Sequence, residues 1–118
     1  MESDKNVILK KFNKAFAEGD VDTILNYVSD NIIWNIKGDK LVKGKENFAV
    51  YIKEMATHES MGLTLGLPVI NGSFAVLEGQ MTSPSGNMYA FCDLYTFETE
   101  EGGEIKSLTS YVIEIPNS

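Results

Sequence analysis

Arginine is absent from this sequence of 118 residues, in which all ten of the residues counted as lysine or arginine are lysine. The chain therefore lacks the planar guanidinium fork that binds a phosphate or a carboxylate through two parallel hydrogen bonds. Seventeen acidic residues give a net charge of −7, which also opposes binding to a phosphate backbone. We expect no nucleic-acid partner.

Cysteine and histidine occur only once each, as Cys92 and His58. A single cysteine cannot form an intramolecular disulfide, and Cys92 lies in an apolar run, so we interpret it as a small buried residue. His58 follows a predicted helix, and we expect it to be solvated at the helix C-terminus. No Cys–His spacing and no calcium-loop pattern occurs, which favours no metal and no cofactor.

Long hydrophobic runs are also missing, since none approaches the roughly 20 residues that a membrane-spanning helix needs. The first five residues are polar and acidic, unlike a signal peptide. We expect a cytoplasmic protein with no membrane partner. The length and a hydrophobic fraction of 43% suit a single domain over residues 1–118 with one core.

Helical periodicity dominates the first half of the chain. A first helix, in which apolar residues recur at helical spacing, can be capped by Ser3 or Asp4 and ends at Gly19. Asp20 can cap a second helix directly afterwards, and a third helix is predicted from about Glu46 to Thr57.

Strand patterns fill the rest of the chain. Residues 32–36 form a β-branched run that predicts a strand, and a loop is expected between Gly38 and Gly44. From residue 62 the apolar period becomes two, with Pro68 indicating an edge or a bulge. Asn71-Gly72 indicates a hairpin, and long strands follow over about 73–83, 88–99 and 104–115. The order ααβαββββ predicts an α+β fold.

The strand from Met88 is apolar on both of its faces. One face carries Tyr89, Phe91, Asp93, Tyr95 and Phe97, and the other carries Met88, Ala90, Cys92, Leu94 and Thr96. An antiparallel sheet with one solvated face would instead alternate between apolar and polar residues. We expect the first face to cover the helices and the second to be covered by another copy of the chain in a homodimer.

Several segments resemble the nuclear transport factor 2-like superfamily, in particular its SnoaL-like and ketosteroid-isomerase-like branches. The similar segments are Phe16-Ala17-Glu18-Gly19-Asp20, residues 27–34, Gly44-Lys45-Glu46-Asn47-Phe48, and the long strands over 86–95 and 103–111. The resemblance implies a cystatin-like, cone-shaped roll, in which helices pack in the concave face of a curved, mainly antiparallel sheet around one apolar cavity.

The resemblance also limits the chemistry that we expect. The hydrogen-bond donor of the ketosteroid isomerases matches Phe12 and their general base matches Ile36, and neither side chain can take that role. A ketosteroid isomerase mechanism is therefore not expected. The second acid of those isomerases matches Asp93, which is also the only charge in the aromatic face. Burial there favours a neutral carboxyl that donates a hydrogen bond; the alternative is a structural carboxylate bonded to Ser110 or Tyr51.

We predict Asp93 as the candidate catalytic residue of a pocket for a small hydrophobic ligand. Its predicted lining is Phe12, Phe16, Trp34, Ile36, Tyr51, Leu77, Met81, Phe91, Tyr95, Ser110 and Val112. Trp34 could instead fill the core, and Tyr51 and Tyr95 could be either lining or core. The expected function is that of a SnoaL-like protein with an apolar pocket for a small hydrophobic molecule, and whether the pocket catalyses an isomerase, cyclase or dehydratase type of reaction stays open. The alternative is a non-catalytic small-molecule-binding or dimeric interaction domain.

Overall fold

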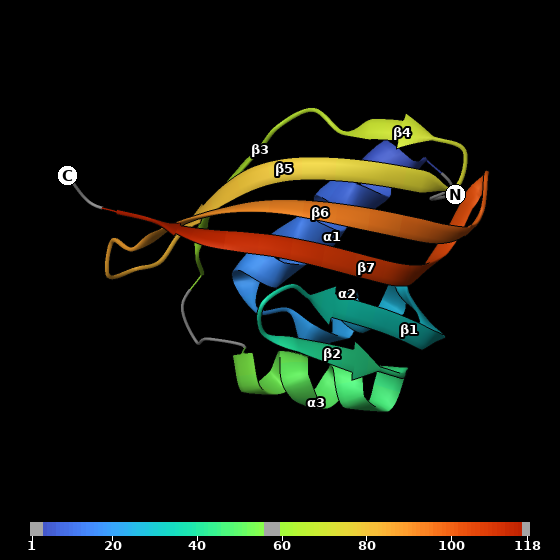
Figure 1. Ribbon diagram of the computed structural model, residues 1–118, viewed down its shortest axis with the longest axis horizontal. Coiled ribbons are helices and arrows are strands. Elements are labelled where there is room, and N and C mark those ends of the chain that lie inside the picture. The colour runs from blue at the N-terminus through green and yellow to red at the C-terminus, as the bar shows by residue number, and fades with distance from the viewer. Residues whose placement is uncertain (1–3, 56–59, 117–118) are drawn as a thin grey trace.

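Three helices and seven strands make up the computed structural model, which describes residues 4–55 and 60–116 (Figure 1). In chain order the elements are α1 (Lys5–Glu18), α2 (Val21–Asn26), β1 (Val28–Ile36), β2 (Lys40–Lys43), α3 (Lys45–Met55), β3 (Gly62–Leu65), β4 (Val69–Asn71), β5 (Phe74–Thr82), β6 (Met88–Thr99) and β7 (Gly102–Ile115). The fold is α+β, as predicted.

Local capping explains the first two helices. The Asp4 carboxylate accepts a hydrogen bond from the backbone N–H of Asn6 at 2.9 Å and begins α1. Gly19, with φ 70°, ends α1 in the left-handed conformation that glycine adopts without strain. Asp20 begins α2 by accepting from the backbone N–H of Thr23 at 3.3 Å.

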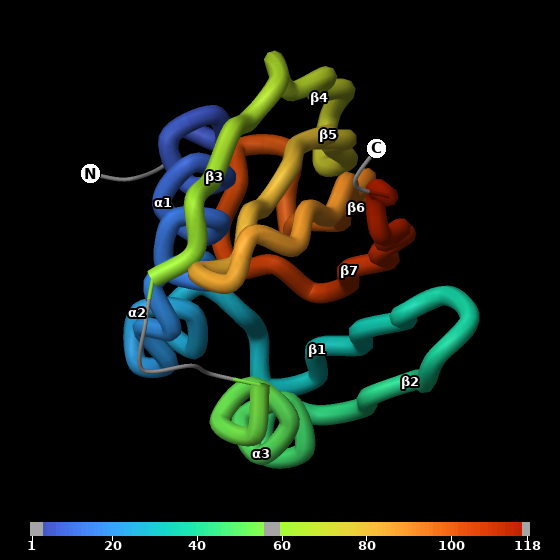
Figure 2. The backbone as a smooth tube through the Cα atoms, turned by 90° about the vertical axis from the view of Figure 1, so that its left-hand side faces the viewer, coloured from blue at the N-terminus to red at the C-terminus, as the bar shows by residue number. Residues whose placement is uncertain are grey.

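The seven strands form one curved, mixed sheet in the order β2-β1-β7-β6-β5-β3, with β4 paired to β5 beside it. Every pairing is antiparallel except that of β1 with β7, which is parallel. Figure 2 shows α1 in the hollow of this sheet, facing β5, β6 and β7, while α3 lies next to β1 and β2.

The structure has two more strands than the predicted order. The expected loop after Gly38 contains β2, in which Val42 pairs with Trp34 and is buried. The predicted single strand from residue 62 is broken between Leu65 and Val69 into β3 and β4. The backbone N–H of Gly66 still bonds to the β5 carbonyl oxygen of Glu78 at 2.8 Å, and Pro68 has no N–H to continue the ladder.

The starts of β1 and α3 also differ from the predictions. β1 begins at Val28 rather than residue 32, and its register with β7 shifts between Val28 and Ile33, so a polar, turn-like segment lies inside a bulged strand. α3 begins at Lys45, one residue before the predicted start. The predicted end of that helix, Thr57, lies outside the described residues, as do Ser3 and His58.

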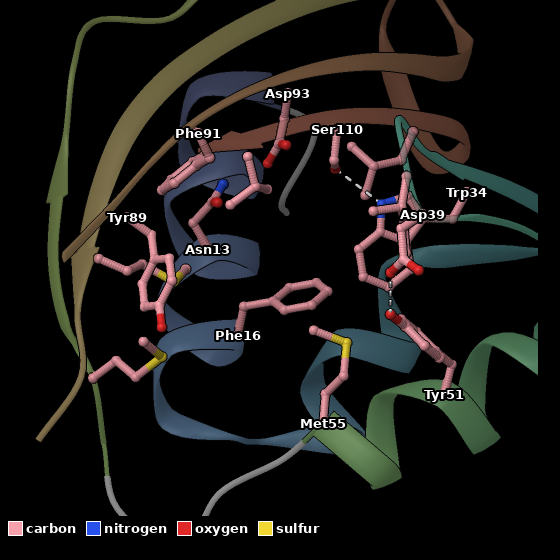
Figure 3. A pocket seen from close by; sticks show the side chains of 15 residues that line it. Asn13, Phe16, Trp34, Asp39, Tyr51, Met55, Tyr89, Phe91, Asp93 and Ser110 are labelled. Atoms are coloured by element: carbon pink, nitrogen blue, oxygen red, sulfur yellow. Dashed lines mark hydrogen bonds between the residues drawn. The ribbon is translucent and has the colours of Figure 1, made fainter. Parts of the chain in front are cut away.

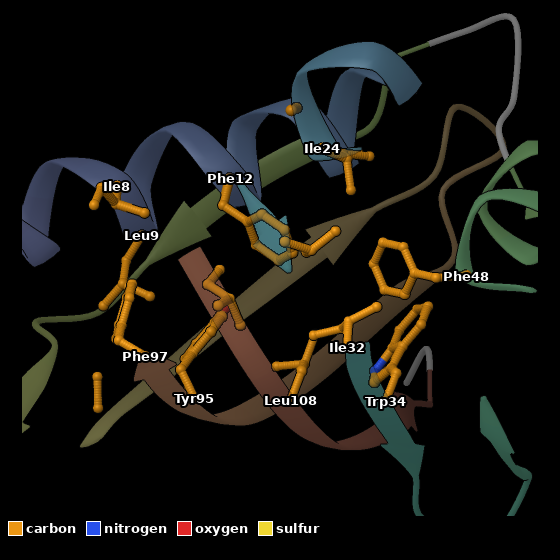
Figure 4. Packing of buried hydrophobic residues seen from close by; sticks show 14 of the residues in the cluster. Ile8, Leu9, Phe12, Ile24, Ile32, Trp34, Phe48, Tyr95, Phe97 and Leu108 are labelled. Carbon is orange, nitrogen blue, oxygen red and sulfur yellow. The ribbon is translucent and has the colours of Figure 1, made fainter. Parts of the chain in front are cut away.

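The hydrophobic core fills the space between α1, α2, α3 and the concave face of the sheet (Figure 4). The inward face of β6 is the predicted one, since Phe91, Asp93, Tyr95 and Phe97 are all buried. On the opposite face of the sheet Ile113 is 66% exposed, so no described part of the chain covers it. Cys92 also lies on this outer face and is half-buried, not fully buried as predicted.

None of the helices within residues 4–55 and 60–116 is long and apolar enough to cross a membrane.

Candidate functional site

A cavity of about 310 Å³ opens between the helices and the concave face of the sheet (Figure 3). Its described lining residues are Asn13, Phe16, Trp34, Ile36, Asp39, Tyr51, Met55, Met61, Met81, Tyr89, Phe91, Asp93, Leu108, Ser110 and Val112. They come from α1, β1, α3, β5, β6 and β7 and from the connections beside them, so the cavity depends on the whole fold. The wall is mostly aromatic and aliphatic, with few polar groups.

Nine of the twelve residues predicted for the site line this cavity. They are Phe16, Trp34, Ile36, Tyr51, Met81, Phe91, Asp93, Ser110 and Val112. Phe12, Leu77 and Tyr95 were wrongly predicted to line it, because each is at most 1% exposed and belongs to the core. The alternation of a strand shows which face is inward, whereas the position of α1 decides where along that face the cavity ends.

Six lining residues were missed from the sequence: Asn13, Asp39, Met55, Met61, Tyr89 and Leu108. Two of them had a visible signal. Tyr89 shares the inward face of β6 with Asp93, and Asn13 is a polar residue four positions after Leu9 in the apolar stripe of α1. Asp39 had no such signal, because it lies in the turn between β1 and the unpredicted β2.

Asp93 lies at the end of a hydrogen-bonded relay and is 8% exposed. Its Oδ2 atom accepts from the Tyr95 hydroxyl at 3.2 Å, and this hydroxyl accepts from Asn13 Nδ2 at 2.9 Å. Ser110 pairs with Asp93 between β7 and β6, and Ser110 Oγ accepts from Trp34 Nε1 at 2.9 Å. The Tyr95 hydroxyl thus accepts from a nitrogen donor, which leaves its own proton for Asp93.

Burial raises the pKa of Asp93 to about 6, against the lowering effect of the hydrogen bonds from Ser110 and Tyr95. A carboxyl with that pKa is mostly ionised at neutral pH, with only about a tenth of the molecules protonated. At neutral pH Asp93 is therefore a hydrogen-bond acceptor and a potential base. It can donate, as the sequence suggested, only in mild acid.

A second polar group lies at the rim of the cavity. The Tyr51 hydroxyl donates to Asp39 Oδ2 at 3.1 Å, and the Lys40 ammonium lies 4.5 Å from the centroid of the Tyr51 ring. Burial and the bonded Asp39 raise the pKa of Tyr51. The Tyr51 hydroxyl therefore donates to Asp39 and not to Asp93, which accepts from Tyr95 instead.

A smaller cavity of about 90 Å³ adjoins the first. Four side chains line both cavities: Phe16, Met55, Met61 and Met81. Methionine side chains are unbranched and adapt their shape to a neighbouring group. Rotation of these methionine side chains would join the two cavities, so a ligand larger than the first cavity could extend into the second.

Within residues 4–55 and 60–116, no group of three or more His, Cys, Asp or Glu residues is arranged to hold a metal ion. His58 lies outside these ranges. The Cys92 thiol faces away from the cavity, and burial followed by the charge of Asp93 raises its pKa.

Solved structures share this fold. An NTF2-like protein of unknown function from Cytophaga hutchinsonii is 28% identical, with a TM-score of 0.73, covering 93% of this chain and 100% of that one. A Methylobium petroleophilum protein of unknown function with a cystatin-like fold is 11% identical, with a TM-score of 0.74, covering 95% and 76%. An epoxide hydrolase from M. tuberculosis, described as LEH-like, is 15% identical, with a TM-score of 0.75, covering 90% and 76%.

The fold and its cavity thus define a protein of the NTF2-like class, with a cystatin-like fold. The family model of the SnoaL-like domain matches residues 9–108, and the chain belongs to that family. No curated protein matches the chain.

Proposed function

We propose that this protein binds a small, largely apolar molecule in the cavity and holds one polar group of that molecule against Asp93. The observation that carries the proposal is a buried carboxylate at the end of a donor relay, in a wall that is otherwise mostly apolar. Pockets of this kind use a few fixed polar groups to orient an apolar ligand. A cavity of about 310 Å³ suits a small ligand, since it is near the lower end of the usual range.

Catalysis by proton transfer is the second candidate, and one observation favours it. Asp93 has a pKa of about 6, close to the value at which a carboxylate works well as a general base near neutral pH. A single base can remove a proton from one carbon of the ligand and return it to another, which is an isomerisation. A dehydration or cyclisation that must expel a leaving group would require an acid in addition to Asp93.

Two ring compounds of nearly identical shape test the proposed binding. Cyclohexanol can donate a hydrogen bond, whereas cyclohexanone can only accept one. Trp34 is the only tryptophan and lines the cavity, so its indole N–H gives a single NMR resonance to titrate. At about pH 8 the ionised Asp93 should favour cyclohexanol by roughly two- to tenfold, the equivalent of one hydrogen bond.

The same titration at about pH 5 should weaken this preference, because the protonated carboxyl can donate to the ketone. Asp93→Asn, whose amide both donates and accepts, should show little preference and little change with pH. Failure of both compounds to shift the Trp34 resonance, or a preference that is the same in wild type and variant, would contradict the proposal.

A further inference from the structure

We propose that the group held against Asp93 is cationic, so that the ligands of this cavity are small hydrophobic amines. The inference rests on the proposed ligand site and names the class of molecule that fits it. It is based on the charges that line the cavity, on the aromatic character of the wall, and on a cation already bound to one of its rings.

The charged groups of the cavity lining are all negative. Asp93 lies deep in the cavity and Asp39 lies at its rim, whereas no lysine or histidine is among the lining residues that the structure describes. The immediate partners of Asp93 are the neutral hydroxyls of Tyr95 and Ser110. Buried carboxylates in proteins are usually paired with a cation. Here the missing charge can come from an ammonium group of a ligand.

Aromatic rings make up much of the rest of the wall: Phe16, Trp34, Tyr51, Tyr89 and Phe91. The faces of such rings carry negative potential and attract ammonium groups. Trp34 connects two of the others, since its ring centroid lies 5.6 Å from that of Phe16 and 5.6 Å from that of Tyr51. An alkylammonium would thus meet apolar surface along its carbon skeleton and negative potential at its charged end.

The Tyr51 ring already binds an ammonium group from the protein itself. Lys40 Nζ lies 4.5 Å from its centroid, while the Tyr51 hydroxyl donates to Asp39. This cluster shows, at the rim, the same combination of an aromatic ring, a carboxylate and an ammonium that we infer for the interior. The net charge of −7 further favours the approach of a cation over that of a carboxylate or a phosphate.

Cyclohexylamine and cyclohexanol test the inference, because they share one ring and differ in charge. At about pH 8 and low salt we expect the amine to bind roughly tenfold more tightly, since a charge-assisted hydrogen bond is about twice as strong as a neutral one. The shift of the Trp34 indole resonance again reports binding. Asp93→Asn should reduce the preference to about twofold or less. Asp39→Asn should reduce it less, because that carboxylate lies at the exposed rim.

Asp30→Asn is the matched control, because it removes one negative charge from an exposed position of β1 that does not line the cavity. It should leave the preference for the amine unchanged. A wild-type measurement makes the test independent of any variant that folds poorly: raising KCl from about 0.05 to 0.5 M should weaken amine binding only slightly, since buried pairs are screened less than exposed ones.

The possible outcomes separate this inference from the proposed function. Cyclohexanol binding as tightly as the amine would overturn the amine inference and leave the ligand site standing. Failure of both compounds to bind would contradict the ligand site as well. Three other results would also overturn the inference: a preference for the amine that falls as much in Asp30→Asn as in Asp93→Asn, one that is lost only in Asp39→Asn, and one that is abolished by salt. In each case the attraction would come from the surface or the rim and not from Asp93.

Discussion

Asp93→Asn removes a buried charge while keeping the shape of the side chain, so its effect on stability should change sign with pH. The carboxyl is 8% exposed, and burial raises its pKa from 3.8 to about 6. Because the folded-state pKa is the higher one, the folded protein binds this proton more tightly than the unfolded chain does. The stabilisation from this group is thus complete below pH 3.8 and is lost as the pH rises through about 6.

The size of the effect follows from the same two pKa values. A difference of about two units at roughly 1.4 kcal/mol each means that the ionised carboxylate costs about 3 kcal/mol at neutral pH. Asparagine avoids that cost. Its amide nitrogen cannot accept from Tyr95 or Ser110, however, so one hydrogen bond worth about 1 kcal/mol is lost. We expect the variant to be about 2 kcal/mol more stable than wild type near pH 7.5 and about 0.5 kcal/mol less stable near pH 4, where the unfolded carboxyl is already partly ionised.

Urea unfolding of both proteins from about pH 4 to pH 8 measures this difference directly. Only the difference between the two curves matters, because every other group titrates in both proteins. Asp30→Asn reports the effect of removing one exposed negative charge from a protein of net charge −7. A difference that stays constant with pH would refute the reasoning. So would a variant that becomes less stable, relative to wild type, as the pH rises.

Three further predictions concern assembly, activity and packing. The uncovered outer face of the sheet should pair two copies of the chain, burying about 1,200–2,000 Å². Light scattering should show a dimer at micromolar concentration and a monomer for Ile113→Lys. A monomeric wild type would contradict this prediction. Turnover of an enone steroid should be undetectable, because the residues that match the donor and the base of the ketosteroid isomerases are Phe12 and Ile36, and neither can take that role. Enzymatic rates would overturn that residue matching. Gly79→Ala would place a Cβ atom 2.6 Å from the Phe91 ring. Urea unfolding should therefore show a free energy of unfolding that is lower by about 1–3 kcal/mol. An unchanged stability would disprove the close contact.

Local chemistry explains why most of the fold could be predicted. The predictive patterns involve residues that are close in the sequence, so each can be recognised without knowledge of tertiary contacts. Examples are the capping residues, the Asn71-Gly72 turn and the alternation along β6. β2 is different, because its four residues become a strand only by pairing with β1, where Val42 faces Trp34. A segment so short has no measurable period, and its partner cannot be identified from the sequence.

The candidate site divides in the same way. Asp93 could be predicted because a charge within a row of aromatic residues breaks the local pattern. Phe91 and Tyr95 belong to the same row, yet Phe91 lines the cavity and Tyr95 lies in the core. What separates them is α1: Asn13 Nδ2 bonds to the Tyr95 hydroxyl, and the Phe12 ring lies 6.0 Å from the Tyr95 ring, centroid to centroid. The sequence of β6 alone does not indicate where α1 will pack against it.

The ionisation state of Asp93 also depends on such distant partners. Desolvation alone, which the sequence indicates, favours the neutral acid, whereas the hydroxyls of Tyr95 and Ser110 favour the carboxylate. Asn13 donates to the Tyr95 hydroxyl, so this hydroxyl cannot turn its proton away from Asp93 without disturbing a buried hydrogen bond. The pKa of Asp93 therefore depends on a residue of α1 that lies 82 positions before Tyr95 in the sequence, and no pattern in β6 predicts that contact.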